Sequence, residues 1–219
     1  MLALYGHPFS SYTWKVLIAL YAGEVDFEFR LLDPTAPDSE HNRFVAANGG
    51  PLGKFPVLVD GDNILFESTT IIEYLARHKP AMGSLLPEET DAAIGVRLLD
   101  RVFDNYVMAP TGEVIGEYLR PEANRDLSRC DAARARLERS YRWLDGWLEY
   151  YPAAGQVTLV ECAAAPMLHY AHWVHPIAAC HARLSAWQAH LEALPPVRRC
   201  IEDARPYRPL FPVPMPPPA

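Results

Sequence analysis

The chain has 219 residues, of which 50% are hydrophobic and 21% are charged, so it can bury the core of one large domain or two small ones. Its formal net charge is -7 and no basic run reaches five residues, which argues against a nucleic-acid partner. No stretch approaches the roughly 20 apolar residues of a membrane span, and the first residues lack a basic, apolar leader. A soluble cytoplasmic protein is expected.

The first 80 residues alternate between strand and helix patterns. Gly6 and Pro8 break the first strand, Gly23 closes the first helix, and Asp60 and Gly61 form a hairpin turn. The expected strands are 2–5, 27–31 (with Phe27, Phe29 and Leu31 on one face), 55–59 and 64–66, and the expected helices are 11–22, 39–47 and 68–78. The order is βαβαββα, which predicts an α/β domain over residues 1–80.

From about residue 90 the pattern is helical only, after a linker at 81–89. The expected helices are 91–119, 122–150, one that starts at 158, 182–193 and 196–204. We expect the first to be kinked near Pro110 and Gly112, and the second to end at Pro152 and Gly155. Thr158 and Glu161 match a capping box, so that pair is expected to be structural. An all-α domain over 90–205 follows.

Residues 206–219 form a proline-rich tail. Seven prolines in this segment predict an extended strap that is not helical, packed through Tyr207, Leu210 and Phe211.

The cysteines and histidines do not predict a metal site. The four cysteines (Cys130, Cys162, Cys180 and Cys200) are scattered and form no CxxC pair, which favours reduced thiols in an intracellular protein. His169, His172 and His175 are spaced by three residues, but no carboxylate pattern completes a site, so packing or substrate contact is expected.

Residues 54–68 contain the most informative pattern in the chain. Pro56 stands at the mouth of a strand, a position typical of an edge strand or a cis bond. Glu67 and Ser68 start a helix, where a carboxylate and a hydroxyl meet unpaired backbone N–H groups. The two features predict a cradle for a small peptide-like ligand, although Glu67 and Ser68 also suit plain helix capping.

Together these motifs resemble the glutathione transferase superfamily. The resemblance rests on Gly53-Lys54-Phe55-Pro56-Val57-Leu58, on Glu67-Ser68-Thr69-Thr70-Ile71-Ile72-Glu73-Tyr74-Leu75 and on Thr158-Leu159-Val160-Glu161. Residues 10–16 are similar to the zeta-class signature, with Tyr12 replacing its cysteine and Lys15 replacing its arginine, which suggests a zeta- or theta-like member. The family implies a thioredoxin-like N-terminal domain, an all-helical C-terminal domain and a homodimer.

The resemblance also implies how glutathione is held. Pro56 is expected to be the cis-proline, and the backbone of Val57 is expected to pair with the cysteinyl part like an added strand. Glu67 is expected to hold the ammonium of the γ-glutamyl end, and Ser68 with the helix N-terminus its carboxylate.

The resemblance assigns residues less specifically to the glycyl carboxylate of glutathione and to the second substrate. Lys54 is expected to hold the glycyl carboxylate, with His41 as a second candidate. Tyr12, Tyr106 and Met108 are expected to line the site of the second substrate, although each also suits core packing.

The predicted chemistry is activation of the glutathione thiol by a serine. The thiolate is the nucleophile, and a hydrogen bond from a hydroxyl together with a helix N-terminus stabilises it. Lowering the thiol pKa by two units requires about 2.7 kcal/mol, which one charge-assisted hydrogen bond and a helix end can supply. Ser10 is the first candidate and Ser11 the second, although both also suit a capping role. Tyr5 is expected to be a core residue.

Three functions are compatible with this sequence. The leading hypothesis is a glutathione transferase that conjugates a small hydrophobic electrophile. A glutathione-dependent isomerase or dehalogenase is the second, and a non-catalytic binding module on the same fold is the third. Glutathione is the expected co-substrate in both enzymes.

Overall fold

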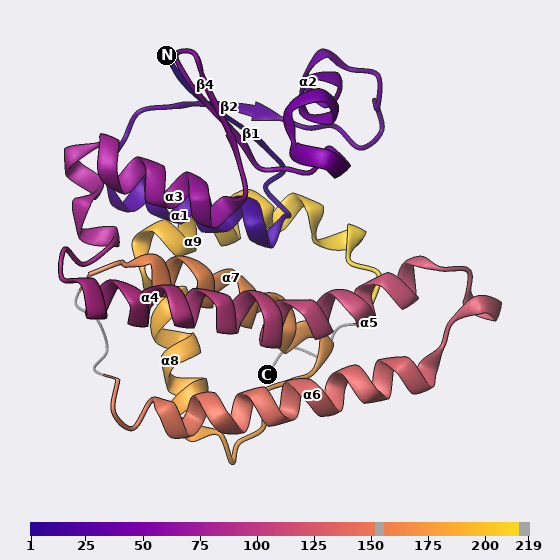
Figure 1. Cartoon of the computed structure of the whole chain (residues 1–219). Helices are drawn as coiled ribbons and strands as arrows, with labels where there is room; N and C mark the ends of the chain where they lie inside the picture. Colours follow the sequence, from indigo (N-terminus) through magenta and orange to yellow (C-terminus); the bar gives the residue numbers. More distant parts are fainter. Residues whose placement is uncertain (152–155, 215–219) are drawn as a thin grey trace.

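The computed structural model describes residues 1–151 and 156–214 and begins with a four-stranded sheet (Figure 1). Its strands are β1 (Leu2–Gly6), β2 (Glu28–Leu31), β3 (Val57–Asp60) and β4 (Asn63–Phe66), and its helices are α1 (Ser11–Ala22), α2 (Glu40–Asn48) and α3 (Ser68–His78). The strand order is β2-β1-β3-β4, with β1 parallel to β2 and the other pairs antiparallel. The predicted order of elements is confirmed.

The two faces of the sheet are covered by different helices. Leu4 and Leu58 join the main core, to which α1 and α3 contribute, whereas the adjacent Tyr5 and Val57 pack against Val45 of α2. Successive strand residues point to opposite faces, which explains this division. Figure 1 shows α1 and α3 between the sheet and most of the helices that follow α3 in the chain.

The rest of the described chain is helical. It contains α4 (Thr90–Val102), the π-helical turn η3 (Phe103–Met108), α5 (Ala109–Leu119), α6 (Leu127–Trp147), α7 (Leu159–Val174), α8 (Ala182–Ala193) and α9 (Pro195–Ala204). Short 3-10 helices are η1 (Gly50–Leu52), η2 (Pro80–Leu85), η4 (Glu122–Asn124) and η5 (Arg205–Leu210). The predicted fold class, a thioredoxin-like domain followed by a helical domain, is confirmed. None of the helices in the described ranges is long and apolar enough to span a membrane.

Helix α7 is the buried centre of the helical part. Its first ten residues are buried, and the small side chains at 163–165 allow close packing. The predicted capping box is present: Thr158 N donates to Glu161 Oε2 at 2.9 Å, and Val160 N donates to Thr158 Oγ1 at 3.1 Å.

The interruption predicted near Pro110 is a π-helical turn that ends two residues before it. Pro110 has no N–H to donate to the carbonyl oxygen of Tyr106, one turn earlier. The Ser140 hydroxyl of α6 donates to that oxygen at 2.7 Å instead. Gly112 lies inside regular α5, so its predicted part in the kink is wrong.

Three predicted boundaries need correction. Helix α6 begins at 127 instead of 122, because the Asp126 side chain caps it by accepting from Arg129 N at 3.1 Å. It ends at Trp147, and the predicted terminators Pro152 and Gly155 lie outside the described residues. The strand predicted to start at Phe27 starts at Glu28 instead, and Leu31 at its end is 41% exposed while the next residue, Leu32, is buried.

The start of the tail is helical, contrary to prediction. Residues 205–210 form the 3-10 helix η5, which tolerates Pro206 because the first turn of a helix needs no N–H donor there. Tyr207 packs on His7 and Phe211 on Phe9 and Trp173, as expected, while Leu210 is 59% exposed.

A buried ion cluster joins α1 and α3 to the helical part. Lys15 Nζ lies 2.7 Å from Asp100 Oδ1, 2.9 Å from Asp104 Oδ1 and 3.1 Å from Thr69 Oγ1. Lys15 and Asp100 are completely buried. Arg101 completes the cluster, 2.9 Å from Asp104. This cluster fixes the orientation of α4 and η3 relative to α1.

Candidate functional site

A polar cavity of about 310 Å³ gathers several of the residues that the sequence singled out. Tyr12, Lys54, Pro56, Glu67 and Ser68 all line it. Its remaining wall is made by Gly49, Phe55, Phe66, Arg101, Asp104, Asn105 and Ala109. The cavity therefore lies between the sheet domain and the π-helical turn, and both parts of the chain contribute to it.

The loop before β3 borders the cavity through Phe55 and Pro56. The peptide bond between them is cis, as expected for Pro56. Val57 is completely buried, pairs with Tyr5 and Phe66 in the sheet, and does not line the cavity. Phe55 precedes the paired residues of β3, so its backbone is better placed than that of Val57 to meet a ligand.

Glu67 has the backbone geometry of a strained residue. Its φ is 67° and its ψ is 110°, a region that favours glycine. It occupies the N-cap of α3, yet its side chain makes no capping hydrogen bond. Ser68 follows it and is 5% exposed. A strained residue whose carboxylate does not cap the helix suggests a ligand contact.

Charged residues of the helical part form the opposite wall, and sequence reasoning missed them. Arg101 and Asp104 are three residues apart, a spacing that on a helix is usually a surface pair. Burial raises the pKa of the Asp104 carboxyl, which Lys15 and Arg101 partly oppose. Only the docking of α4 and η3 on the sheet domain brings these side chains to the cavity, so no local signal was available.

His41 does not take part in this cavity. Its Nδ1 lies 3.0 Å from the carbonyl oxygen of Leu31, and its ring packs edge-on against Tyr5. Tyr5 is 4% exposed, stacks on Phe44 and accepts a hydrogen bond from Arg30. The structure thus gives Tyr5 the core role that was expected.

An apolar pocket, also of about 310 Å³, adjoins the two serines. Ser10, Ser11, Tyr12 and Met108 all line it. The other lining residues are Phe9, Ile115, Leu119, Tyr170, Leu210, Phe211 and Pro212. Several of these come from the tail, which therefore forms one wall of the pocket.

The serines occupy the first turn of α1. Ser10 is its N-cap and accepts a hydrogen bond from Thr13 N at 3.3 Å, so the capping role is realised. A hydroxyl that accepts in this way still has its proton to donate. Ser11 follows it and is 6% exposed. Both can therefore present a donor to an anion in the pocket.

Tyr12 is the side chain that both spaces share. It is 37% exposed and lines the polar cavity as well as the apolar pocket. Burial, together with Asp104 and Glu67, raises the pKa of its phenol to about 12. It is therefore a neutral hydroxyl at the boundary between the two spaces.

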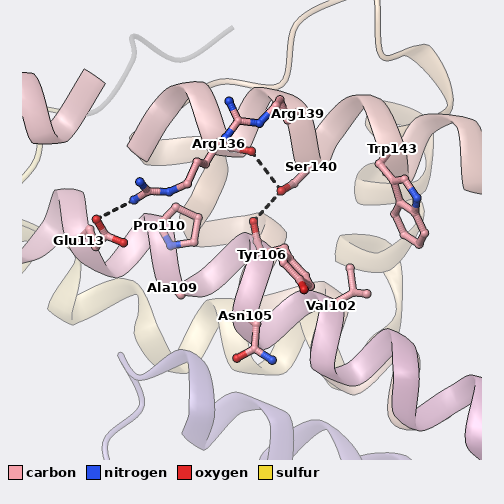
Figure 2. A pocket seen from close by; sticks show the side chains of 10 residues that line it. All are labelled: Val102, Asn105, Tyr106, Ala109, Pro110, Glu113, Arg136, Arg139, Ser140 and Trp143. Carbon is pink, nitrogen blue, oxygen red and sulfur yellow. Dashed lines mark hydrogen bonds and ion pairs between the residues drawn. The ribbon is translucent and has the colours of Figure 1, made fainter. Parts of the chain in front are cut away.

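Tyr106 lies elsewhere, in a groove of about 500 Å³ between η3, α5 and α6. Figure 2 shows it with Trp143 and with Arg136, which lies 2.6 Å from Glu113. Tyr106 is 62% exposed and does not line the pocket that holds Tyr12 and Met108. The side chain was expected beside them, but it lines the groove between η3, α5 and α6 instead.

The two histidines of α7 and the one that follows it, His175, all contact other residues of the chain. His169 Nδ1 lies 2.8 Å from Glu192, His172 Nδ1 accepts from Ile177 N, and His175 Nε2 lies 3.4 Å from Glu138. Over residues 1–151 and 156–214, no group of three or more His, Cys, Asp or Glu side chains is arranged to hold a metal ion.

Known proteins resemble this chain in sequence and in fold. Residues 4–83 match the family model described as glutathione S-transferase, N-terminal domain. The chain is 32% identical to glutathione S-transferase F6 of Arabidopsis thaliana over 179 residues, which are 76% of this chain and 82% of that protein. It is 29% identical to a glutathione S-transferase of Silene vulgaris over 203 residues, 88% and 93% of the two chains. A glutathione S-transferase from Methylobacillus flagellatus, solved with GSH bound, superposes with a TM-score of 0.76 at 25% identity, over 91% of this chain and 98% of that one.

Proposed function

Because the chain belongs to the glutathione S-transferase superfamily, we propose that it is an enzyme that joins glutathione to a small hydrophobic electrophile. The observation that carries this proposal is that the polar cavity and the apolar pocket adjoin each other. Tyr12 lines both, so a thiol that leaves the polar cavity enters the apolar pocket beside Ser10 and Ser11.

The polar cavity suits the groups of the tripeptide. Glu67 binds the ammonium of the γ-glutamyl end, while Ser68 and the N-terminus of α3 bind its carboxylate. The backbone of Phe55 pairs with the cysteinyl part, in place of Val57, because Phe55 lines the cavity and Val57 does not. Lys54 holds the glycyl carboxylate and is preferred to His41 for the same reason.

The chemistry is nucleophilic attack by the thiolate. The thiol proton leaves to solvent, and the Ser10 hydroxyl and the N-terminus of α1 stabilise the sulfur anion. The sulfur then forms a bond to an electrophilic carbon, whose leaving group or π electron pair departs. Ser11 is the second candidate for the donor.

Binding and turnover test this proposal directly. Calorimetry is expected to show saturable binding at millimolar glutathione. Incubation with an activated aryl halide is expected to consume glutathione and release halide. Isomerisation of a maleyl-type substrate without glutathione consumption would favour the isomerase instead, and the absence of binding would remove both enzymes.

Replacing Glu67 with glycine separates ligand binding from backbone strain. We expect the glutathione Kd to rise roughly 10- to 100-fold, because a charge-assisted hydrogen bond is worth about 1.5–3 kcal/mol. The free energy of unfolding is expected to change by less than about 1 kcal/mol, because relief of positive φ offsets the flexibility of glycine. Calorimetry and denaturant unfolding measure the two effects.

Glu24→Gly is the matched control for this substitution. Glu24 also has a positive φ, of 50°, but lies at the end of α1 and lines neither the polar cavity nor the apolar pocket. Its variant is expected to keep the wild-type Kd. An equal loss of affinity in both variants would contradict a specific role for Glu67.

The assembly, compartment and subgroup are also proposals. Exposed apolar side chains on β4 (Ile64 and Phe66) and α4 (Ile94 and Leu98) support a homodimer, which sedimentation would detect as twice the chain mass. Four free cysteines support a cytoplasmic location. A zeta- or theta-like subgroup rests on the segment over residues 10–16.

A further inference from the structure

The loop that carries Ser10, between β1 and α1, is held by side chains of α1 and of the loop itself. His7 N donates to Thr13 Oγ1 at 3.4 Å, and Ser10 N donates to the carbonyl oxygen of His7 at 3.0 Å. Phe9 N donates to Nδ1 of the His7 ring at 3.1 Å. Each of these bonds satisfies a backbone group that the sheet and the helix leave unpaired, so the loop has a defined conformation.

Trp14 holds this loop from inside the protein. Its side chain is completely buried, and its ring packs on His169 and Tyr170 of α7. The indole N–H donates to the carbonyl oxygen of Pro8 at 2.5 Å, two residues before Ser10. A buried indole needs an acceptor for its N–H, and here the acceptor belongs to the loop that ends at the serine. Trp14 therefore connects the packing of α1 on α7 to the backbone that carries the serine hydroxyl.

The His7 ring is suited to its part in this loop. Burial lowers the pKa of His7, while Asp33 opposes this effect, so the ring is neutral near neutral pH. A backbone N–H can only donate, so the Nδ1 that accepts from it carries no proton, and the ring proton lies on Nε2. Tyr207 packs against the ring, with 4.5 Å between the two ring centroids. The neutral ring is thus an acceptor in a fixed place.

We propose that Trp14 is a positioning residue for thiol activation: its indole N–H holds the Pro8 carbonyl, and the loop in turn holds the Ser10 hydroxyl beside the sulfur of glutathione. The inference rests on the proposed role of Ser10. A donor that is already in place stabilises the thiolate more than one that must first be ordered, because ordering the loop costs part of the same free energy. Trp14 lines neither the polar cavity nor the apolar pocket, so it acts through the loop.

Trp14→Phe tests this assignment, because it removes the N–H and keeps an aromatic ring. We expect the thiol pKa of bound glutathione to rise by roughly one unit and kcat/KM for conjugation to fall roughly 10-fold. The glutathione Kd at about pH 5, where the thiol stays protonated, is expected to change less than about two-fold. Trp187→Phe is the matched control, since this side chain is 5% exposed, packs on Phe103 and Trp147, and lines neither the polar cavity nor the apolar pocket.

A double variant that combines Trp14→Phe with Ser10→Ala separates positioning from general damage to the fold. If Trp14 acts through Ser10, its replacement is expected to lower kcat/KM less than about two-fold once the hydroxyl is absent. A further loss of about 10-fold in that background would overturn the proposal, as would a wild-type thiol pKa in Trp14→Phe. Full turnover by Ser10→Ala would overturn both this inference and activation by Ser10. A wild-type chain that does not bind glutathione would overturn the transferase function as well.

The His7 ring supplies a second test that does not alter the completely buried core, because His7 is only partly buried. His7→Leu removes the acceptor of Phe9 N, whereas in His7→Asn the amide oxygen can accept in the place of Nδ1. We expect the thiol pKa of bound glutathione to rise in His7→Leu and to recover in His7→Asn. An equal thiol pKa in these two variants would show that the loop does not position the serine hydroxyl.

Discussion

Replacing Lys15 with methionine is expected to lower the free energy of unfolding by about 3–5 kcal/mol, because it leaves buried carboxylates without their main cation. Lys15 and Asp100 are completely buried, and Lys15 Nζ lies within 2.9 Å of both Asp100 and Asp104. Arg101 remains beside both aspartates but is itself half exposed, so it screens them only in part. Chemical denaturation near pH 7 measures the loss.

The pH dependence of this loss identifies its cause. The pKa of Asp104 is already raised in the folded protein, and Lys15 lowers it, so removing Lys15 raises it further. A carboxyl with a raised folded pKa stabilises the protein below that pKa and loses this contribution as pH rises. The deficit of the Lys15→Met variant is therefore expected to shrink as the pH is lowered from 7 toward the ordinary pKa of an aspartate, about 3.9.

Lys79→Met is the matched control for Lys15→Met. Lys79 lies 2.8 Å from Asp60, but both side chains are partly exposed, at 28% and 20%. An exposed pair contributes about 0–1 kcal/mol. Equal losses in the two variants would show that burial of the ion cluster is not the source of the effect.

Replacing Ser10 with alanine is expected to lower kcat/KM for glutathione conjugation roughly 10- to 100-fold. The hydroxyl is proposed to donate to a sulfur anion, and such bonds are worth about 1.5–3 kcal/mol. The thiol pKa of bound glutathione is expected to rise by about 1–2 units in the same variant. Steady-state kinetics and ultraviolet titration of the thiolate measure both.

Ser10 also caps α1, so its removal has a structural effect that needs a control. Ser39 caps α2 through a bond of the same length, 3.3 Å to Asn42 N. Ser39→Ala is expected to lose about 1 kcal/mol of stability, like Ser10→Ala, without a shift in thiol pKa. If Ser10→Ala and Ser11→Ala both kept full turnover, activation by a serine would be refuted.

The part of the polar cavity that the sheet domain contributes could be predicted from the sequence because its sequence features are local. A proline before a strand and a Glu-Ser pair before a helix each determine backbone geometry within a few residues. Pro56, Glu67 and Ser68 accordingly line one cavity. Val57 is completely buried and does not line that cavity, and a pattern alone does not tell which backbone groups the sheet already uses.

The residues that α4 and η3 contribute to the polar cavity could not be predicted from local sequence. Arg101 and Asp104 reach the cavity only because Lys15, more than 80 residues earlier, holds α4 against α1. Tyr106 was expected beside Met108, but the pattern at 91–119 did not reveal that its interruption is a π-helical turn. Such long-range packing has no signature in a short window of sequence.

The π-helical turn η3 also determines which residues of the segment from α4 to α5 face the polar cavity and which face the apolar pocket. Each residue of a regular helix advances about 100° around its axis, and a π-helical turn adds roughly one residue to a turn. Deleting one residue between 103 and 108 would rotate α5 by about that angle relative to α4. Ile115 and Leu119 would then leave the apolar pocket, while Arg101 would still line the polar cavity. One inserted residue therefore sets the rotation of α5, which lines the pocket, relative to α4, which lines the cavity.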